Sequence, residues 1–461
     1  MENLQVTPLQ PPVLEEAVVE EFRASLKGEL LRPGDAGYDE ARTVWNAMID
    51  RHPALIARCV DVDDVAAAVN FARTHNLLVA VRGGGHNVAG KAVCEGGLMI
   101  DLSPMKGIHI DPENRTALVE PGVLWGELDQ ATQAYGLATT GGTVSHTGVP
   151  GLTLGGGLGW LMATHGLACD NLLSTQVVLA DGQTLTASST EHPDLFWAVR
   201  GGGGNFGIVT RFEFRLYPVG PTVLGGMILY PFEQAREILR FYRDVATNSP
   251  DELSVFAGLL STPEGIPVVA LLVGWFGPLD EGERHVEPIR KFGSPIADMV
   301  GPIPYCQLQS MLDDGVPFGI QRYWKSGYYE ELSDELLDMI VDQASTKTSP
   351  MTTVILFHMH GVSTRVSPEE TAFGLRRNQW DFDIVTQWLD PATASEHIKW
   401  TRAFWEAVEP LSAGVYVNHL DADDSSSRVR AAYGPNYERL AELKRQYDPN
   451  NFFQLNHNIV P

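Results

Sequence analysis

The stretch "VRGGGHNVAG" at residues 81–90 places three consecutive glycines between an arginine and a histidine, directly after the apolar run "LLVA" at 77–80. A glycine in regular structure costs roughly 0.5–1 kcal/mol relative to alanine, because its backbone loses more conformational freedom on folding. Two explanations for such a run are open at this point. It is either a tight surface turn or a loop whose bare backbone must approach a ligand.

The residues before this loop predict a β-α-β unit. "ALIARCV" at 54–60 and "LLVAV" at 77–81 are strand-like, and "VDDVAAAVNFARTHN" at 62–76 has apolar residues at helical spacing. Such a short unit predicts a parallel pair of strands joined by a right-handed crossover. The loop then begins at the carboxyl end of a parallel strand, where open α/β sheets bind ligands. This position favours the binding loop over the turn.

The composition is that of an ordinary globular protein, and 461 residues suit two or three domains. The net charge of −25 disfavours nucleic acids and anionic membranes as partners. The sequence begins with neither a basic segment nor an apolar run, so we expect no secretory signal, no membrane span and a cytoplasmic location. The four cysteines are far apart in the sequence, and this spacing predicts neither a disulfide framework nor a metal site.

Proline and glycine divide the chain near "YPVGP" at 217–221. Before this point, from residue 98, short strands alternate with glycines. After it, alternating strands such as "PVVALLVGWFG" and "TTVILFHMHGV" are separated by long helical runs such as "FEQAREILRFYRDVATN". This arrangement is typical of an α+β domain with an antiparallel sheet. The chain closes with a predicted helix, "YERLAELKRQY", and an extended segment.

Two further glycine clusters differ in what they predict. "GGGNFG" at 202–207 spells a dinucleotide fingerprint, but a helical segment precedes it and a strand follows, which is the reverse of the order that such a fingerprint needs. The cluster at 139–171 contains "GVPGLTLGGGLGW", in which consecutive backbone N–H groups can form a nest for pyrophosphate. Two such loops indicate a long phosphate-bearing ligand. A barrel-like turn region that needs small residues is the alternative.

Four ordered motifs resemble the berberine-bridge-enzyme-like oxidases of the vanillyl-alcohol oxidase superfamily: "VRGGGHNVAG", "GVPGLTLGGGLGWLMATHGLACDN", "DLFWAVRGGGGNFGIVT" and the closing "YGPNYERLAELKRQYDPNNFFQLNHNIVP". The resemblance implies a two-domain α+β flavoprotein. Its FAD-binding domain of the PCMH type has two α/β subdomains, and its substrate domain has an antiparallel sheet covered by helices. We place the FAD-binding domain at 1–218, the substrate domain at 219–420 and a C-terminal segment that returns to the FAD-binding domain at 421–461.

The resemblance also assigns cofactor-binding residues. His86 would be joined covalently to the 8α-methyl carbon of FAD, since a neutral imidazole is a nucleophile near pH 7. A histidine that only donates a hydrogen bond to a phosphate is the alternative. The other positions that the resemblance assigns to FAD binding are Arg82, Gly83, Gly84, Gly85, Asn87, Gly142, Thr143, Gly148, Gly151, Gly155, Gly156, Gly159, His165, Asp170, Gly207, Ile208, Asn418 and Asn456.

Two positions depart from what relatives carry. Some relatives have a second, cysteinyl bond to the flavin, but Val144 stands at that position, so a single bond through His86 is expected. Cys169 comes after the glycine cluster and is expected to be a small buried residue. Thr147 stands where relatives carry a valine that controls oxygen access, and this leaves open whether the enzyme is an oxidase or a dehydrogenase.

The catalytic residues implied by the resemblance are Tyr416, as the base that takes a substrate proton, and Asp383 as its partner. Hydride transfer from an alcohol to a flavin needs such a base. A phenol of pKa about 10 is a poor base at neutral pH unless its surroundings lower that value. Asp381 and Asp383 would share one face of a strand. A solvated edge strand is the alternative for this segment.

Three other candidates for substrate contact carry weaker signals. His358 and His360 lie two residues apart in "LFHMHG", where they would line the pocket, bind a metal or simply pack in the strand. The aromatic stretch "RYWKSGYY" at 322–329 offers a stacking surface or core packing. His146 is next to Thr147 and would lie near the substrate.

The function expected from these observations is that of an FAD-dependent oxidase. It would take a hydride from a C–H bond next to a hydroxyl of a sugar or other alcohol and reduce O2 to H2O2. Alternatives are the oxidation of a C–N or phenolic natural product, electron transfer to another acceptor, and a flavin-carrying binding protein without turnover. The sequence indicates a small-molecule substrate but neither its identity nor the oligomeric state.

Overall fold

In the computed structural model, which describes residues 14–461, the glycine loop leaves the end of a four-stranded sheet of order β1-β2-β4-β3. β2 and β3 both run parallel to β4, and β1 is antiparallel to β2. The bounds are β1 (Glu29–Leu31), β2 (Leu55–Arg58), β3 (Val79–Arg82) and β4 (Leu98–Asp101). The predicted helix is confirmed as α3 (Val62–Thr74), and the Asp61 side chain caps its first turn.

β2 and β3 are parallel, as predicted, but they do not pair with each other, because β4 lies between them. All four residues of β4 are buried. A strand that is buried on both faces belongs at the centre of a parallel sheet, where helices or other layers cover it. The later segment therefore occupies the position between the two earlier strands.

The second sheet of the N-terminal half is five-stranded and antiparallel, in the order β5-β6-β10-β8-β9. The stretch "GGGNFG" comes between α7 and β10, so the predicted order of helix before strand is confirmed. The elements of this half are α1 (Glu16–Ser25), α2 (Tyr38–Arg42), β5 (Ile108–Asp111), β6 (Thr116–Val119), α4 (Trp125–Gln133), β7 (Leu137–Ala138), α5 (Val149–Leu154), α6 (Met162–His165), β8 (Leu172–Val178), β9 (Thr184–Ser188), α7 (Pro193–Val199), β10 (Ile208–Arg215) and β11 (Tyr217–Pro218).

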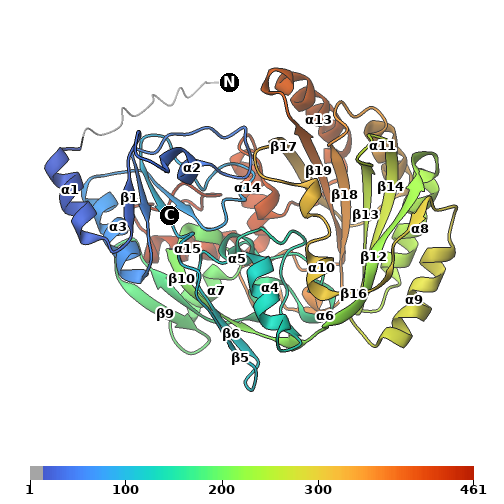
Figure 1. Cartoon of the computed structure of the whole chain (residues 1–461), viewed down its shortest axis with the longest axis horizontal. Coiled ribbons are helices and arrows are strands. Elements are labelled where there is room, and N and C mark those ends of the chain that lie inside the picture. The colour runs from blue at the N-terminus through green and yellow to red at the C-terminus, as the bar shows by residue number, and fades with distance from the viewer. Residues whose placement is uncertain (1–13) are drawn as a thin grey trace.

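A large antiparallel sheet forms the other half, in the order β15-β12-β14-β13-β18-β19-β17, with β16 also paired to β12. Figure 1 shows this sheet on the right, with α8, α9 and α11 on its outer side. The elements are β12 (Thr222–Pro231), α8 (Ala235–Thr247), β13 (Leu253–Ser261), β14 (Pro267–Trp275), α9 (Leu279–Lys291), β15 (Ala297–Asp298), β16 (Gly301–Pro304), α10 (Tyr305–Gln309), β17 (Gln321–Tyr329), α11 (Asp334–Ala344), β18 (Thr353–Met359), α12 (Val362–Arg365), β19 (Gln379–Trp388) and α13 (Ala394–Val408). The predicted α+β class is confirmed.

Side-chain alternation gives this sheet two different faces. On β19, Trp380, Phe382 and Ile384 pack in a hydrophobic core with residues of α8, α11 and α13. The residues between them, such as Asp381 and Asp383, face the N-terminal half and line a cavity. The period of two along a strand thus separates the residues that hold the helices from those available for chemistry.

The predicted domain boundary at 218/219 falls between β11, which pairs with β7 of the N-terminal half, and β12, which begins the large sheet. The chain returns to the N-terminal half through α14 (Ser426–Tyr433) and α15 (Tyr437–Tyr447). Figure 1 shows these red helices beside the N-terminal half. No helix within residues 14–461 combines the length and the apolar character needed to span a bilayer.

A buried ion pair holds this C-terminal segment. Lys444 Nζ donates to Asp448 Oδ2 at 2.7 Å, to Asn205 O at 2.7 Å and to Phe453 O at 3.1 Å, and both charged side chains are fully buried. Asn205 belongs to the N-terminal half and Phe453 to the closing segment. The ammonium group therefore joins α15, the last residues and the N-terminal half at one point.

Replacing Lys444 with alanine leaves Asp448 buried without its cation, so we expect the apparent free energy of unfolding to fall by about 3–5 kcal/mol. Denaturant unfolding followed by circular dichroism measures this loss. Lys399 is exposed on α13, and Lys399→Ala is the matched control, with an expected change within about 0.5 kcal/mol. A loss of less than about 1 kcal/mol for Lys444→Ala, as for a surface pair, would contradict the role of the pair.

Candidate active site

A cavity of about 940 Å³ lies between the glycine loops of the N-terminal half and the inner face of the large sheet. Small-molecule and cofactor sites commonly measure about 300–1,000 Å³, so this cavity is at the upper end of the range. Its wall combines backbone from the glycine loops with apolar side chains from the sheet, such as Phe256, Leu272 and Phe357. The shape suits a long ligand that is bound along the loops and capped by the sheet.

The two predicted glycine loops meet at Gly84 and Gly148. A methyl group added to Gly84 would come within 2.6 Å of Gly148 Cα and closer still to the Gly148 nitrogen, and the reverse holds for a methyl group at Gly148. Only glycine permits such an approach of two backbones. The contact brings the loop after β3 against the start of α5, and both glycines line the cavity.

Most of the residues predicted to bind FAD line this one cavity. They come from five separate parts of the sequence, which the fold brings together. The predicted positions in the cavity wall are Gly83, Gly84, Gly85, His86, Asn87, Gly142, Thr143, Gly148, Gly151, Gly159, Gly207, Ile208, Asn418 and Asn456.

Three predicted cofactor-binding side chains lie outside the cavity wall and have other partners. The Arg82 guanidinium donates to the Ala41 carbonyl. His165 stacks on Tyr217, with 3.9 Å between ring centroids. Asp170 accepts two hydrogen bonds from Arg376, at 2.6 and 2.8 Å. These contacts give each of the three side chains a structural role.

Gly155 and Gly156 also lie outside the cavity wall, although the resemblance assigns both to FAD binding. A methyl group at Gly155 would overlap the Asn418 side chain, which is itself part of the wall. Gly156 has φ of +127°, a conformation that favours glycine, and its α-carbon faces the Phe373 ring. The two glycines thus lie next to the cavity wall without forming part of it.

His86 presents a neutral imidazole to the cavity. Its Nε2 lies 2.7 Å from His146 Nδ1, and its ring stacks on Trp45 with 4.8 Å between centroids. Burial lowers the pKa of His86 well below its usual value, and the nearby His146 and Arg322 lower it further. A neutral ring nitrogen is the form that can act as a nucleophile.

Val144 and Thr147 both line the cavity, as expected for positions next to a bound flavin. Cys169 is fully buried and is not part of the wall. Burial raises the pKa of its thiol, and the neighbouring Asp170 raises it further. A thiol that is kept protonated in this way is a poor nucleophile.

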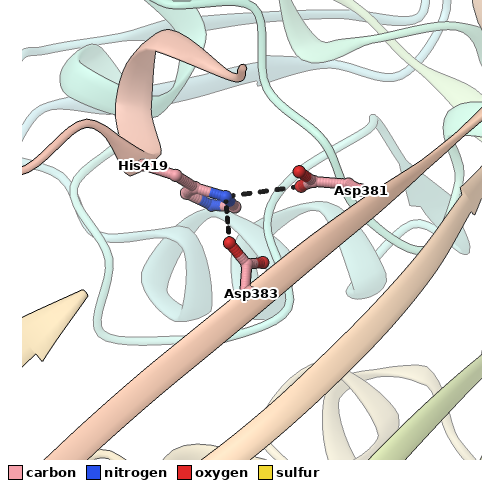
Figure 2. Close-up of side chains that lie close together, drawn as sticks. All are labelled: Asp381, Asp383 and His419. Atoms are coloured by element: carbon pink, nitrogen blue, oxygen red, sulfur yellow. Dashed lines mark ion pairs between the residues drawn. The ribbon is translucent and has the colours of Figure 1, made fainter. Parts of the chain in front are cut away.

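An acid-base cluster lies in the opposite wall of the cavity. Figure 2 shows Asp381 and Asp383 pointing from β19 toward His419, which comes from the turn Val417–His419. His419 Nδ1 lies 2.9 Å from Asp383 Oδ1 and 3.3 Å from Asp381 Oδ2. Both carboxylates are 1% exposed, so the alternative of a solvated edge strand was wrong. β19 is an interior strand, paired with β17 and β18.

The pKa values of Asp381 and His419 depend on burial and on the charges of their neighbours in this cluster. Burial raises the pKa of Asp381 to about 6, and the Asp383 charge also raises it, while His419 lowers it. Burial alone would lower the pKa of His419, but the two carboxylates outweigh this effect and raise the value to about 10. His419 therefore carries a proton near neutral pH. These side chains are of types that can bind metal ions, but their charges are already paired with one another, so we interpret the cluster as an acid-base group.

Sequence reasoning missed His419. The only signal for it is its position directly after the predicted "YVN" segment, which contains Tyr416 and Asn418. Its partners come from a strand more than 30 residues earlier in the chain, and no local spacing indicates that they meet.

Tyr416 is in the cavity wall, but some of its surroundings raise the pKa of its phenol and others lower it. Burial raises the pKa of its phenol, while hydrogen bonds from Gly157 N at 2.8 Å and Asn418 Nδ2 at 2.7 Å lower it in part. The net direction is upward, so the expected lowering by neighbours is not found. Its ring lies edge-on to His419, with 4.8 Å between centroids.

Of the weaker candidates, the aromatic stretch and His146 reach the site. Trp324 lines the cavity, and its indole Nε1 donates to Asp383 Oδ1 at 2.8 Å. His146 contacts His86, as described above. His358 lies on the helix side of β18, where its Nδ1 is 3.0 Å from the Ala246 carbonyl and its ring stacks on Trp380. His360 stacks on His358 and is likewise outside the cavity wall.

Comparison with known proteins places this arrangement among flavoenzymes. Residues 53–188 match the family model of an FAD binding domain, and residues 415–460 match the model described as berberine and berberine like. An FAD-linked oxidoreductase of Dictyostelium discoideum is 34% identical over 451 residues, which is 96% of this chain and 97% of that protein.

Two further similarities concern enzymes that act on a nicotine derivative. (R)-6-hydroxynicotine oxidase of Paenarthrobacter nicotinovorans is 32% identical over 464 residues, with 95% of this chain and 97% of that protein covered. The crystal structure of 6-hydroxy-D-nicotine oxidase from Arthrobacter nicotinovorans superposes with a TM-score of 0.87 at 31% identity, covering 95% of this chain and 98% of that one. These similarities span both halves of the fold.

The close approach of Gly84 and Gly148 generates a prediction for flavin binding. Gly84→Ala forces the two loops apart, so we expect purified protein to lose most of its bound flavin, measured as visible absorbance per polypeptide. Gly301→Ala is the control, because a methyl group there meets nothing within 4 Å. Equal flavin content in the two variants would contradict the proposed importance of the contact.

Proposed function

This chain belongs to the berberine-like family of FAD-linked oxidoreductases, and we propose that it oxidises a small molecule at a C–H bond next to a hydroxyl, with O2 as the electron acceptor. It is an FAD-dependent oxidoreductase. The residues present fit FAD, because the glycine loops leave open backbone along one wall of a cavity large enough for a dinucleotide and a substrate. When bound, FAD supplies a two-electron acceptor at its N5 atom.

The observation that carries the proposal is the buried acid-base cluster in the wall facing the glycine loops. An alcohol must lose its hydroxyl proton as its hydride leaves, and this requires a proton acceptor in contact with the substrate. Asp381 and Asp383 offer such acceptors, and they lie in one wall with the protonated His419 and with Tyr416. Trp45 and Trp324 add flat apolar surface to the same cavity, which suits a ring-shaped substrate such as a sugar.

We propose that His86 holds FAD alone, through a bond to the 8α carbon. The hydrogen-bonding contact between His86 Nε2 and His146 leaves Nδ1 as the nitrogen available for this bond. Val144 has no nucleophile, and Cys169 is buried outside the cavity wall. A single histidyl bond is the arrangement that these three positions support.

Oxidation of a C–N bond is a second candidate. (R)-6-hydroxynicotine oxidase is among the similar proteins, and two carboxylates beside a single imidazolium give the cluster a net negative charge when all three are ionised. A cationic nitrogen would be attracted to such a wall. An alcohol would give its hydroxyl proton to the same carboxylates. The two candidate functions are therefore distinguished by whether alcohols or amines are oxidised.

Acid precipitation tests the proposed bond. The wild-type pellet should stay yellow, because a covalent bond survives denaturation, and the His86→Ala pellet should be colourless, with FAD left in the supernatant. Cys169→Ala serves as the control and should keep a yellow pellet. A colourless wild-type pellet would contradict covalent attachment.

Peroxide release from a panel of sugars, simple alcohols, phenols and amines tests the reaction. We expect peroxide with members that carry an oxidisable hydroxyl, because the wall offers a proton acceptor. Oxidation of amines alone would support the second candidate. Flavin reduction under nitrogen without peroxide in air would indicate a dehydrogenase, and no reduction by any compound would overturn the proposed activity.

A further inference from the structure

The two carboxylates of the acid-base cluster have different partners. Asp383 Oδ1 accepts the indole N–H of Trp324 at 2.8 Å and lies 2.9 Å from His419 Nδ1. Asp381 is farther from His419, at 3.3 Å, and neither of its oxygens accepts a hydrogen bond from any residue in the part of the chain described. Asp383 thus has one oxygen, Oδ1, in a hydrogen bond with Trp324 and a second, Oδ2, that accepts none from the described residues, whereas both oxygens of Asp381 lack a hydrogen bond and its side chain lines the cavity.

We propose that Asp381 is the catalytic base that takes the hydroxyl proton of the substrate, and that Asp383 and His419 are positioning residues that act through it. This inference rests on the proposed oxidation of an alcohol. It assigns the proton to a residue other than Tyr416, whose oxygen already accepts two N–H groups.

The hydrogen-bonding pattern explains why Asp381 suits this role. A buried polar group without a partner is costly, and the cost is removed when a ligand supplies the missing hydrogen bond. A substrate hydroxyl that donates to Asp381 would satisfy an oxygen that nothing in residues 14–461 satisfies. At Asp383 the Trp324 indole already occupies Oδ1 and, within the described part of the chain, only Oδ2 lacks a hydrogen bond, whereas both oxygens of Asp381 lack one.

The substrate O–H bond breaks and its proton passes to an Asp381 oxygen, while the C–H bond breaks and its electron pair leaves with the hydrogen as hydride to the flavin. The carbon–oxygen single bond becomes a double bond. O2 then accepts two electrons and two protons to give H2O2, and one of these protons is the one that Asp381 must release before the next turnover.

The groups that face Asp381 set its response to pH. Asp383 lies two residues along the same strand, His419 comes from the turn at 417–419, and Tyr328 is its register partner on β17. On β18 the register partner is Phe357, which carries no charge. Burial raises the pKa of Tyr328 well above its usual value, so Tyr328 stays neutral. The balance of burial, Asp383 and His419 puts the pKa of Asp381 at about 6, close to the pH at which an efficient base works.

The first test is Asp381→Asn in the FAD-loaded enzyme, which keeps the shape of the side chain and removes the base. Removal of a general base typically costs about 10²–10⁴-fold, so we expect anaerobic flavin reduction to slow by that factor. Wild-type reduction should rise with pH through about 6, because the base must be ionised, and this rise should be absent from the variant. Asp244→Asn, on the outer helix α8, is the matched control and should reduce at the wild-type rate.

The second test uses the opposite effects of the two neighbours on Asp381. Asp383→Asn removes a negative charge that raises the pKa of Asp381, so the rise should move to lower pH. His419→Gln removes a positive charge that lowers this pKa, so the rise should move to higher pH. Shifts in the same direction, or no shift in either variant, would overturn the assignment.

Infrared difference spectroscopy gives a readout that needs no substrate. Titration of the FAD-loaded protein should show carboxylic acid absorption that disappears near pH 6, to which both Asp381 and the buried Asp421 contribute. Subtracting the Asp381→Asn titration from that of the wild type should leave one band with a midpoint near pH 6, because Asp421 is the same in both proteins. No such difference band for Asp381→Asn, together with one for Asp383→Asn, would show that Asp383 titrates instead. If one of the three variants Asp381→Asn, Asp383→Asn and His419→Gln fails to bind FAD, the assignment is tested with the pH dependence of the remaining two.

The outcomes separate this inference from the proposed function. If no hydroxyl compound is oxidised by the wild-type enzyme, the proposed function fails, whatever the infrared titration shows. If hydroxyl compounds are oxidised and Asp381→Asn reduces its flavin at the wild-type rate, the assignment of Asp381 fails and the function stands. Loss of the pH-dependent rise in Tyr416→Phe, but not in Asp381→Asn, would return the role of base to Tyr416.

Discussion

The contact between the backbones of Gly84 and Gly148 is the constraint on which the site depends. Two loops that are more than 60 residues apart in sequence meet where neither has a side chain, and their exposed backbone becomes one wall of the cavity. A Cβ at either position would overlap the backbone nitrogen of the other glycine, so the two loops would have to move apart. The cost in backbone entropy of the glycine clusters is therefore offset by a surface that can lie against a phosphate-bearing cofactor.

The facing wall is built on a different principle, the alternation of side chains along a strand. β19 places Trp380, Phe382 and Ile384 in the core beneath the helices and Asp381 and Asp383 in the cavity. A slip of one residue in register would bury the carboxylates under the helices and expose the aromatic residues. The packing of the hydrophobic core thus fixes the position of the chemical groups, and the large sheet serves both stability and reaction.

Sequence reasoning found what is encoded locally and missed what arises from tertiary contact. The glycine loops, the helix Val62–Thr74, the reversed order around "GGGNFG" and the alternation that puts Asp381 and Asp383 on one face all follow from spacing along the chain. The insertion of β4 between β2 and β3 was missed, because strand order is set by packing between distant segments. His419 was missed for the same reason, since its two partners lie on β19. The structural role of Asp170 was hidden because its partner, Arg376, is 206 residues away in the sequence.

The Asp170–Arg376 pair connects these two walls. Arg376 is fully buried, donates to both carboxylate oxygens of Asp170, and lies three residues before the start of β19. Asp170 follows the second glycine cluster in the FAD-binding half. A bidentate pair with a planar guanidinium restrains both distance and orientation, so it holds the strand that carries Asp381 at a set position above the loops that would hold the flavin. Hydride transfer and proton removal must occur on one bound substrate, and this charged pair is one of the contacts that fix the strand carrying Asp381 relative to the glycine loops, as is the hydrogen bond of Ser145 to Asp313.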